Sequence, residues 1–354
     1  MHGAKAGNKR NELADRLLET LRKKPGQRVK HNSLARRLSA SEAEMARAAE
    51  CLLDWGYIIR GGPGWYEFKC APDALLDTEI TFGLRTKRLG QQVHAYRKVK
   101  STIPIATSLA NAGAPEGTLV IAEEQSAGRG RLGRTWHSPP GVGAYLSLIL
   151  RPKVAAADTP ALSIVAAIAL AEAVEKQTAL AAQVKWPNDV LVRGRKVAGI
   201  LTGMSADGTR VCHVIVSAGL NINQMRGDFS PELSAKAASL RMLARRKVDR
   251  AALVRAFLEI LERRYTTFVR SGFSPLRKKA RALSALLGHQ ISITGAATSG
   301  VSGALRAPEA RWSKAKTIRG EVIDIDDCGR LLVNTGSDII ALIAGEVTLE
   351  GNYP

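Results

Sequence analysis

Glycine and arginine alternate in one short stretch of the chain, between two apolar runs. The stretch is Gly128-Arg-Gly-Arg-Leu-Gly-Arg134; Gln125 precedes it, and Trp136 and a Pro139-Pro140-Gly141 turn follow. Glycine lets a backbone come close to a ligand. Guanidinium groups bind phosphate and carboxylate groups through two parallel hydrogen bonds. The pattern therefore predicts a loop that closes over an anion.

The glycine spacing also matches the dinucleotide fingerprint G-x-G-x-x-G, through Gly128, Gly130 and Gly133. That fingerprint opens a helix and needs an acidic residue about 20 positions later. Here Pro139-Pro140 prevents a helix soon after the loop, and residues 148–153 contain no acid. We therefore interpret the stretch as a basic ligand-binding loop, against the simpler reading of a solvated Arg-Gly loop.

A second stretch, residues 185–201, carries polar groups on a predicted hairpin. It begins Lys185-Trp-Pro-Asn188-Asp189, turns at Arg193-Gly194 and returns through Lys196. A lysine on a rigid hairpin beside an Asn-Asp pair suits nucleotide and Mg²⁺ chemistry. By itself such a lysine is usually a surface residue, so the prediction depends on its coincidence with the glycine-arginine loop.

Together the two stretches resemble the signature motifs of biotin–protein ligases. A third piece, Val216–Asn223, is similar to the glycine-asparagine strand end of that family. The resemblance covers roughly residues 95–350 and looks most like the longer bacterial type with a DNA-binding domain. It implies an α+β protein with an N-terminal winged helix-turn-helix, a mixed-sheet catalytic domain and an SH3-like barrel. The expected boundaries are 1–70, a linker at 71–96, 97–285 for the catalytic domain and 286–354 for the barrel.

The N-terminal region has its own pattern. Helices are predicted over Asn11–Lys24, after Asn32-Ser33, and from Ser41 to about Trp55, with a hairpin over 57–68. Three helices and a β-wing are typical of a winged helix-turn-helix.

The expected recognition helix does not have the composition of a base-reading helix. It carries Glu42, Glu44 and Glu50 against a single Arg47, and phosphates repel carboxylates. A biotin-responsive repressor and a retained structural or regulatory domain both remain open.

Periodicity gives the remaining elements. A helical linker is expected over 71–94, and residues 304–317 look like an insertion in the barrel. Strands are expected at 119–122, 144–150, 183–186, 189–193, 196–205 and 210–219. Helices are expected at 104–111, 161–177, 232–242, 249–270 and 274–287.

The resemblance implies two reactions in one site: adenylation of biotin by ATP, then transfer of biotin to a lysine of a carrier protein. Ile103 stands where the family usually has asparagine, and Leu132 where it often has a basic residue. The residues expected to act in catalysis are Lys196, Arg131 and Asp189. Those expected to bind biotin are Ser101, Thr102, Ile103, Gln125, Arg129, Gly130, Arg131 and Lys196. Those expected near ATP or the adenylate are Arg129, Arg131, Arg134, Trp136, Lys185, Asn188, Asp189 and Asn221.

The expected cofactors are ATP, biotin and Mg²⁺, with no metal site made by the protein alone. The expected partner is the biotin carboxyl carrier protein of acetyl-CoA carboxylase. DNA binding through residues 10–70 and homodimerisation are further expectations. The four scattered cysteines and the polar N-terminus fit a reducing cytoplasm without a membrane span. The apolar run at 164–171 is too short to cross a bilayer.

Net charge is +20 and is uneven along the chain. Residues 1–100 carry 20 basic and 11 acidic side chains, and residues 241–281 carry 13 and 3. Such blocks attract nucleic acid or an acidic protein, or they are solvated helix faces.

Three other classes of function remain. A lipoate–protein ligase shares the fold and adenylation chemistry, but its own signature is absent here. A transcription factor with an inactive ligase domain, and a carrier-binding module without chemistry, are the other two alternatives.

Overall fold

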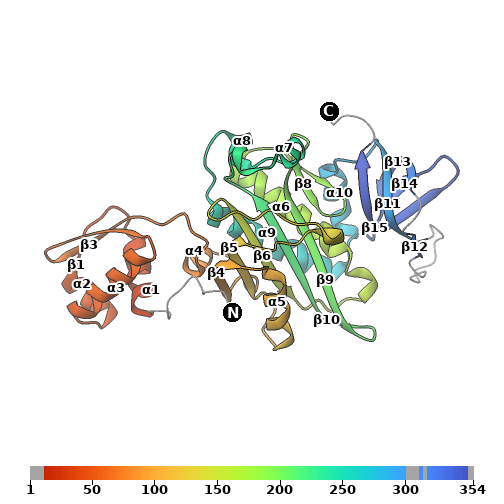
Figure 1. Cartoon of the computed structure of the whole chain (residues 1–354). Helices are drawn as coiled ribbons and strands as arrows, with labels where there is room; N and C mark the ends of the chain where they lie inside the picture. Colours follow the sequence, from red (N-terminus) through yellow and green to blue (C-terminus); the bar gives the residue numbers. More distant parts are fainter. Residues whose placement is uncertain (1–11, 300–310, 314–316, 350–354) are drawn as a thin grey trace.

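The computed structural model describes residues 12–299, 311–313 and 317–349. Three units follow one another (Figure 1): a small helical unit near the N-terminus, a central unit built on a large sheet, and a β-barrel near the C-terminus. The helical and barrel units lie at opposite ends of the central unit.

The N-terminal unit is a three-helix cluster with a wing, as predicted. Its helices are α1 (Glu12–Arg22), α2 (His31–Leu38) and α3 (Glu42–Asp54); its strands β1 (Val29–Lys30), β2 (Ile58–Gly62) and β3 (Trp65–Cys70) pair in the order β1-β3-β2. The Ser41 hydroxyl accepts from the Glu44 amide, and the Glu44 carboxylate accepts from the Ser41 amide. This capping box fixes the start of α3.

The linker is less helical than the sequence indicated. Its helix, α4, spans only Asp77–Thr81, and strand β4 (Val93–Val99) already pairs with β5 of the central sheet. The expected start of the catalytic domain at 97 therefore falls inside a strand of its sheet.

The central sheet has seven strands in the order β4-β5-β6-β10-β9-β8-β7. It is mixed: β4 and β5 run parallel, and the other neighbours are antiparallel. The strands after β4 are β5 (Leu119–Gln125), β6 (Gly143–Leu150), β7 (Ala182–Lys185), β8 (Asp189–Val192), β9 (Arg195–Asp207) and β10 (Arg210–Asn221).

Helices cover the two faces of this sheet unequally. On one face α5 (Thr102–Asn111) packs over Val120, Ile149 and Ile215. The other face is buried by the main core, which includes α6 (Ala161–Thr178), α9 (Arg250–Ser271) and α10 (Ser274–Leu283). The α5 face is therefore the one with room for a ligand.

The single helix expected at 232–242 is wrong. The structure has α7 (Pro231–Lys236) and α8 (Leu240–Ala244), because Ala237 is extended and the Ser239 hydroxyl caps a new helix by accepting from the Met242 amide. Helix α10 also ends earlier than expected, at Leu283.

By length and composition alone, residues 156–178, which include α6, could cross a membrane. However, 78% of the apolar window is buried inside the central unit. Helix α6 is therefore the core helix of this unit.

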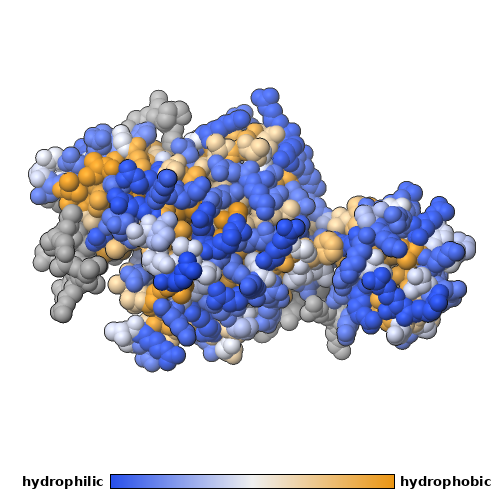
Figure 2. Space-filling view, turned by 180° about the vertical axis from the view of Figure 1, so that it is seen from behind, coloured by the Kyte–Doolittle hydropathy of each residue, from blue (hydrophilic) through white to orange (hydrophobic). Residues whose placement is uncertain are grey.

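The C-terminal strands form a closed barrel. β11 (Gln290–Ser299) pairs with both β13 (Ile318–Ile325) and β15 (Ile339–Leu349), and β14 (Leu331–Asn334) joins the last two. Of the predicted insertion 304–317, the short strand β12 (Arg311–Ser313) pairs with β11; apart from β12 and residue 317, the insertion lies outside the described residues. Figure 2 shows a mostly hydrophilic surface with an apolar area on the barrel.

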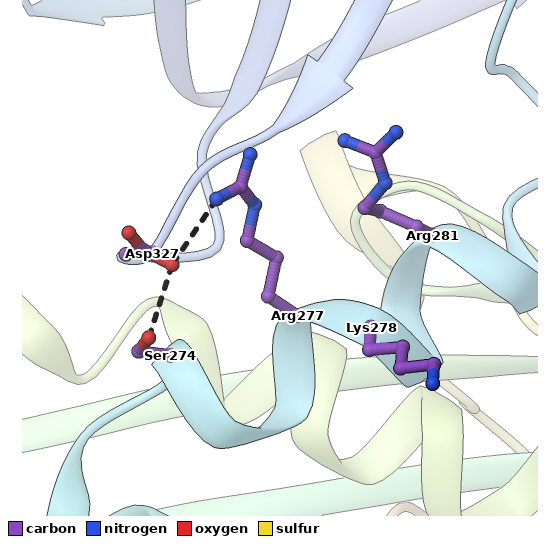
Figure 3. Close-up of a pocket in the computed structure, with 5 residues that line it drawn as sticks. All are labelled: Ser274, Arg277, Lys278, Arg281 and Asp327. Carbon is purple, nitrogen blue, oxygen red and sulfur yellow. Dashed lines mark hydrogen bonds and ion pairs between the residues drawn. The ribbon is translucent and has the colours of Figure 1, made fainter.

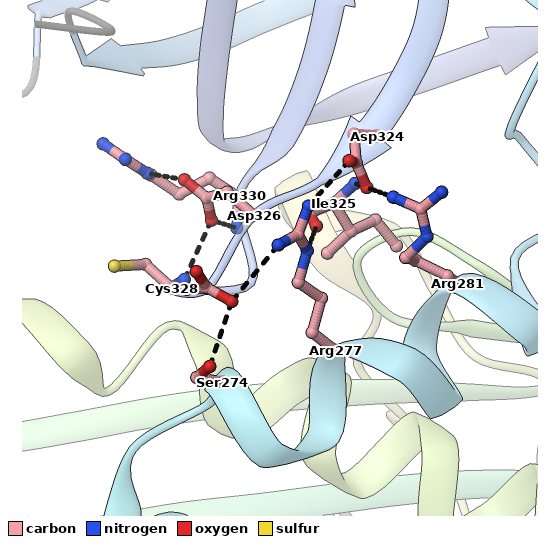
Figure 4. A network of polar contacts seen from close by, with 9 residues as sticks. Ser274, Arg277, Arg281, Asp324, Ile325, Asp326, Cys328 and Arg330 are labelled. Carbon is pink, nitrogen blue, oxygen red and sulfur yellow. Dashed lines mark hydrogen bonds and ion pairs between the residues drawn. The ribbon is translucent and has the colours of Figure 1, made fainter. Parts of the chain in front are cut away.

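The barrel is fastened to the central unit by charged side chains of α10. Arg277 donates to Asp324 at 2.8 Å and to the Ile325 carbonyl at 2.8 Å, and Arg281 pairs with the same Asp324 (Figure 4). Asp327 of the β13–β14 turn accepts from Ser274 at 3.0 Å (Figure 3). This part of the basic segment 241–281 is thus neutralised within the chain.

Candidate functional site

The glycine-arginine loop connects β5 to β6, and its two arms are hydrogen-bonded to each other. Arg129 and Thr135 form an isolated bridge, and the Gly130 amide donates to the Arg134 carbonyl at 2.7 Å. A Cβ at Gly128 would lie 2.4 Å from the Trp136 carbonyl oxygen, so only glycine fits there. The loop is therefore pinned at its base, and its arginines are carried on the tip.

The tip of the loop reaches the predicted hairpin. Arg131 donates to the Asn188 side-chain oxygen at 2.9 Å, and the Asn188 amide donates to Asp189 at 3.1 Å. Lys196 pairs with Asp189, with Nζ 2.7 Å from Oδ1. Four predicted site residues thus meet in one cluster, although 57 positions separate Arg131 from Asn188.

The Trp136 indole packs directly against two glycines of the sheet. Gly199 and Gly219 are partners in the β9–β10 ladder, and a Cβ on Gly219 would lie 2.4 Å from the indole. Lys196 Nζ is 5.4 Å from the ring centroid, within cation–π range. Trp136 therefore lies on the α5 face of the sheet, next to the reactive cluster of Arg131, Asn188, Asp189 and Lys196. Its Nε1 is buried and has no hydrogen-bond partner in the described part of the chain.

Burial lowers the pKa of two cationic side chains near this cluster. Burial lowers the pKa of the Lys185 ammonium group, against the raising effect of Asp189. Burial also lowers the pKa of Arg131, although guanidinium keeps its charge at neutral pH. Arg134 pairs with Glu346, a barrel residue. Several cations are therefore held close together, as an anionic ligand requires.

A second group of predicted residues meets at the start of α5. Gln125 Oε1 accepts from the Thr102 amide at 2.9 Å and from its hydroxyl at 3.3 Å. The Ser101 hydroxyl accepts from the Ile103 amide at 3.4 Å, so Ser101 is also the helix cap. Thr102 and Gln125 are thus brought together, as expected of residues that orient one head group.

A cavity of about 270 Å³ opens beside this second group. It is lined by Ile103 and Thr107 of α5, residues 201–205 of β9, and His213, Ile215 and Ser217 of β10. Its apolar walls with a few polar groups are typical of a small-molecule site.

Two predicted residues are placed apart from these groups. Arg129 is exposed. Asn221 is buried at the end of β10, where it accepts from Gln224 at 3.3 Å. Among the described residues, no hydrogen bond joins either side chain to Lys196.

The described residues contain no group of three His, Cys, Asp or Glu side chains that could hold a metal ion. Asp189 is the carboxylate beside Lys196 and Asn188. Mg²⁺ at nucleotide sites is held by one or two carboxylates together with phosphate oxygens. The donor set therefore fits a magnesium ion brought with a nucleotide.

Sequence reasoning missed three groups of this site. Ser147 and Ser217 join the Thr102 hydroxyl across β6 and β10, and Glu346 pairs with Arg134 from the barrel. No motif marks Ser147, and Ser217 lies in the Val216–Asn223 stretch, which drew notice for its glycine and asparagines. The alternation of the two serines with apolar residues along each strand was the one available signal, and it does not say which strands are neighbours.

Comparisons with known proteins agree with the geometry. Residues 95–221 match the biotin/lipoate A/B protein ligase family, and residues 313–349 match the biotin protein ligase C-terminal domain. A bifunctional ligase/repressor, BirA, of Bacillus subtilis is 35% identical over 344 residues, which is 96% of this chain and 99% of that protein. The chain belongs to the biotin protein ligase family.

Other members of the family are similar over smaller parts. A biotin–[acetyl-CoA-carboxylase] ligase of Paracoccus denitrificans is 38% identical over 51% of this chain and 76% of its own. The solved biotin protein ligase of Aquifex aeolicus, in complex with biotin and ATP, is 26% identical with a TM-score of 0.59. It covers 74% of this chain and 100% of its own. The family thus supports the predicted α+β fold and its C-terminal barrel.

Proposed function

We propose that this protein is an ATP-dependent biotin–protein ligase, in which Lys196, Asp189, Asn188 and Arg131 surround the reacting groups. The observation that carries the proposal is the contact of the glycine-arginine loop with the hairpin, through Arg131 and Asn188 at 2.9 Å. This contact supports an anion site built from cations of the loop and of the hairpin.

In the first step a carboxylate oxygen of biotin attacks the α-phosphorus of ATP, and pyrophosphate leaves. Lys196 holds the carboxylate and the α-phosphate together, after exchanging its bond to Asp189 for them. Arg131 stabilises the negative charge that develops on the phosphoryl oxygens. Asp189 would help to hold Mg²⁺, which would supply further positive charge beside the phosphates.

In the second step the amine of a carrier lysine attacks the carbonyl carbon of biotinyl-5′-AMP, and AMP leaves. Asp189 accepts the proton of the incoming amine. The loop keeps water away from the mixed anhydride, which hydrolyses in its presence. The acceptor is the biotin carboxyl carrier protein of acetyl-CoA carboxylase, and both proteins work in the cytoplasm.

The test is pyrophosphate release from MgATP with and without biotin, followed by addition of a biotin carrier domain. We expect release that depends on biotin, and label that passes to the carrier. Lipoate in place of biotin serves as the control, and release with lipoate but not with biotin would favour the lipoate-ligase alternative. Absence of release with either acid would contradict the ligase proposal.

A role in transcription is the second candidate. The three-helix unit with its wing supports it, as does the match to a bifunctional ligase/repressor. Against it, Glu42, Glu44 and Glu50 are all exposed on α3, where phosphates would repel them. A gel shift on the promoter of biotin-synthesis genes, with and without biotin and ATP, tests it; a biotin-dependent shift would establish repression, and none would leave the unit a structural role.

A further inference from the structure

Three hydroxyl groups form a chain inside the central unit, from the predicted head-group site to the 270 Å³ cavity. Thr102 Oγ1 lies 2.8 Å from Ser147 Oγ, and Ser147 Oγ lies 2.8 Å from Ser217 Oγ. Ser147 is fully buried, whereas Ser217 lines the cavity. The chain therefore connects Gln125 with the cavity wall through groups that solvent does not reach.

The orientation of the Gln125 amide at one end of this chain is fixed by its partners. Its Oε1 accepts from the Thr102 amide, and its Nε2 donates to Ser138 at 3.1 Å, so the two ends cannot be exchanged. The Ser138 hydroxyl in turn donates to the Trp136 carbonyl at 3.0 Å, which leaves its oxygen free to accept from Gln125. The oxygen and the nitrogen of the Gln125 amide thus each have a hydrogen-bond partner of the right kind.

One proton order starts from this fixed acceptor. A hydroxyl has a single proton, and a Thr102 proton directed to Gln125 Oε1, 3.3 Å away, leaves the Thr102 oxygen to accept from Ser147 and the Ser147 oxygen to accept from Ser217. In that order the Ser217 proton points to Ser147, and a lone pair of the Ser217 oxygen faces the cavity.

We propose that Ser217 is a specificity-determining hydrogen-bond acceptor for an N–H group of the biotin ureido ring, and that Ser147 is the positioning residue that keeps it an acceptor. This inference rests on the proposed ligase function. It adds to the biotin site two residues that the sequence analysis did not single out.

The position of Ser217 along the sheet agrees with the length of the ligand. Ser217 pairs with Leu201, and the next pair on the same face is Gly219 with Gly199. A step of two residues along a strand is about 6.6 Å. Lys196 Nζ lies 3.2 Å from a Cβ position on Gly199. A ureido ring at Ser217 therefore has its valeryl chain on the face of the sheet that carries Lys196.

The experiment is calorimetric titration of the full-length protein with biotin and with biotin methylated at each ureido nitrogen in turn. For Ser217→Ala we expect about 10- to 100-fold weaker biotin binding, the usual effect of one lost buried hydrogen bond. In ligase assays KM for biotin rises while kcat at saturating biotin stays the same. Ser163→Ala, a buried serine of α6 outside the hydroxyl chain, is the matched control.

The methylated ligand separates recognition from a general structural effect. The methyl group at the nitrogen that faces Ser217 should weaken binding to the parent protein, and Ser217→Ala should regain part of it because the lost oxygen leaves room. Ser147→Ala should weaken biotin roughly 10-fold through the loss of proton order.

Three results would overturn the inference. One is a loss of affinity for methylated biotin, relative to biotin, that is the same in the parent protein and in Ser217→Ala. Another is unchanged biotin binding by Ser217→Ala, and the third is unchanged binding by Ser147→Ala. Failure of the parent protein itself to bind biotin would instead contradict the proposed function, so the two failures are distinguishable.

Discussion

The residues of the cluster around Lys196 come from different parts of the chain. Lys196 is on β9, Asp189 begins β8, and Arg131 comes from the loop. The bond of 2.7 Å between Lys196 and Asp189 holds the ammonium group in place before a ligand arrives.

Lys196→Ala removes the cation that we propose to lie between the biotin carboxylate and the α-phosphate. We expect biotin-dependent pyrophosphate release to fall by roughly two to three orders of magnitude, since the negative charge of the transition state loses its fixed partner. The thermal midpoint should change little, because Lys196 is partly exposed. Undiminished release by the folded variant would remove our central assignment.

Arg131→Ala removes the contact that joins the loop to Asn188. We expect the variant to release biotinyl-AMP into solution, because the loop then opens before the carrier lysine arrives. Chromatography of free adenylate after a single turnover measures the leak. A variant that retains the intermediate as well as the parent protein does would contradict this role.

At the scale of elements, the close packing of strand, loop and indole depends on two glycines. Gly199 and Gly219 let Trp136 lie directly on the β9–β10 ladder. Neighbouring strands with side chains at these positions would push the loop away from the sheet. The glycines therefore set how close the loop comes to Lys196.

Gly219→Ala places a methyl group where the indole now lies. We expect a loss of about 1–3 kcal/mol in the free energy of unfolding, or displacement of Trp136 with weaker biotin binding. The fluorescence difference between this variant and a Trp136→Phe, Gly219→Ala double variant isolates the signal of Trp136. An emission and a stability equal to those of the parent protein would show that the indole does not rest on this glycine.

Across the whole molecule, the central unit is held to its neighbours by charged groups at both ends. Arg250 is 1% exposed and donates to Asp73 of the linker at 2.8 Å and to Glu123 of β5 at 2.6 Å. Nearer the N-terminus, Glu79 of α4 accepts from Arg22 of α1. At the barrel end, Trp186 donates to the Gly329 carbonyl at 3.0 Å. Arg22 and Arg250 are therefore paired with acidic groups within the fold.

Asp73→Asn tests the linker contact through its dependence on pH. Burial raises the pKa of Asp73, but hydrogen bonds and positive charges of Lys247 and Arg250 outweigh it and leave the pKa below its ordinary value. A carboxyl group with a lowered folded-state pKa contributes stability above its ordinary pKa, and that stability is lost as pH falls through the folded-state pKa. The parent protein should exceed the variant in thermal midpoint at about pH 6, and the gap should close towards about pH 3. A gap that does not depend on pH would contradict the charge contribution.

The sequence by itself determined the family, the order of the three units and the members of the reactive cluster. Local rules were sufficient there: the capping box at Ser41 and Glu44 fixes α3, and the glycine-arginine loop and the Lys196 hairpin are continuous motifs. The break between α7 and α8 was missed because Ser239 begins a new helix inside a run with helical composition.

Only the tertiary structure decided which distant side chains meet. Ser147 and Ser217 are 70 positions apart, and their contact depends on β6 and β10 being neighbours in the sheet. Glu346 reaches Arg134 only because the barrel closes against the central unit. Alternation along a strand indicates which face a side chain is on, but it carries no information about the partner strand. The polar environment of the proposed ureido site is therefore a property of the packed sheet, beyond what its signature motifs specify.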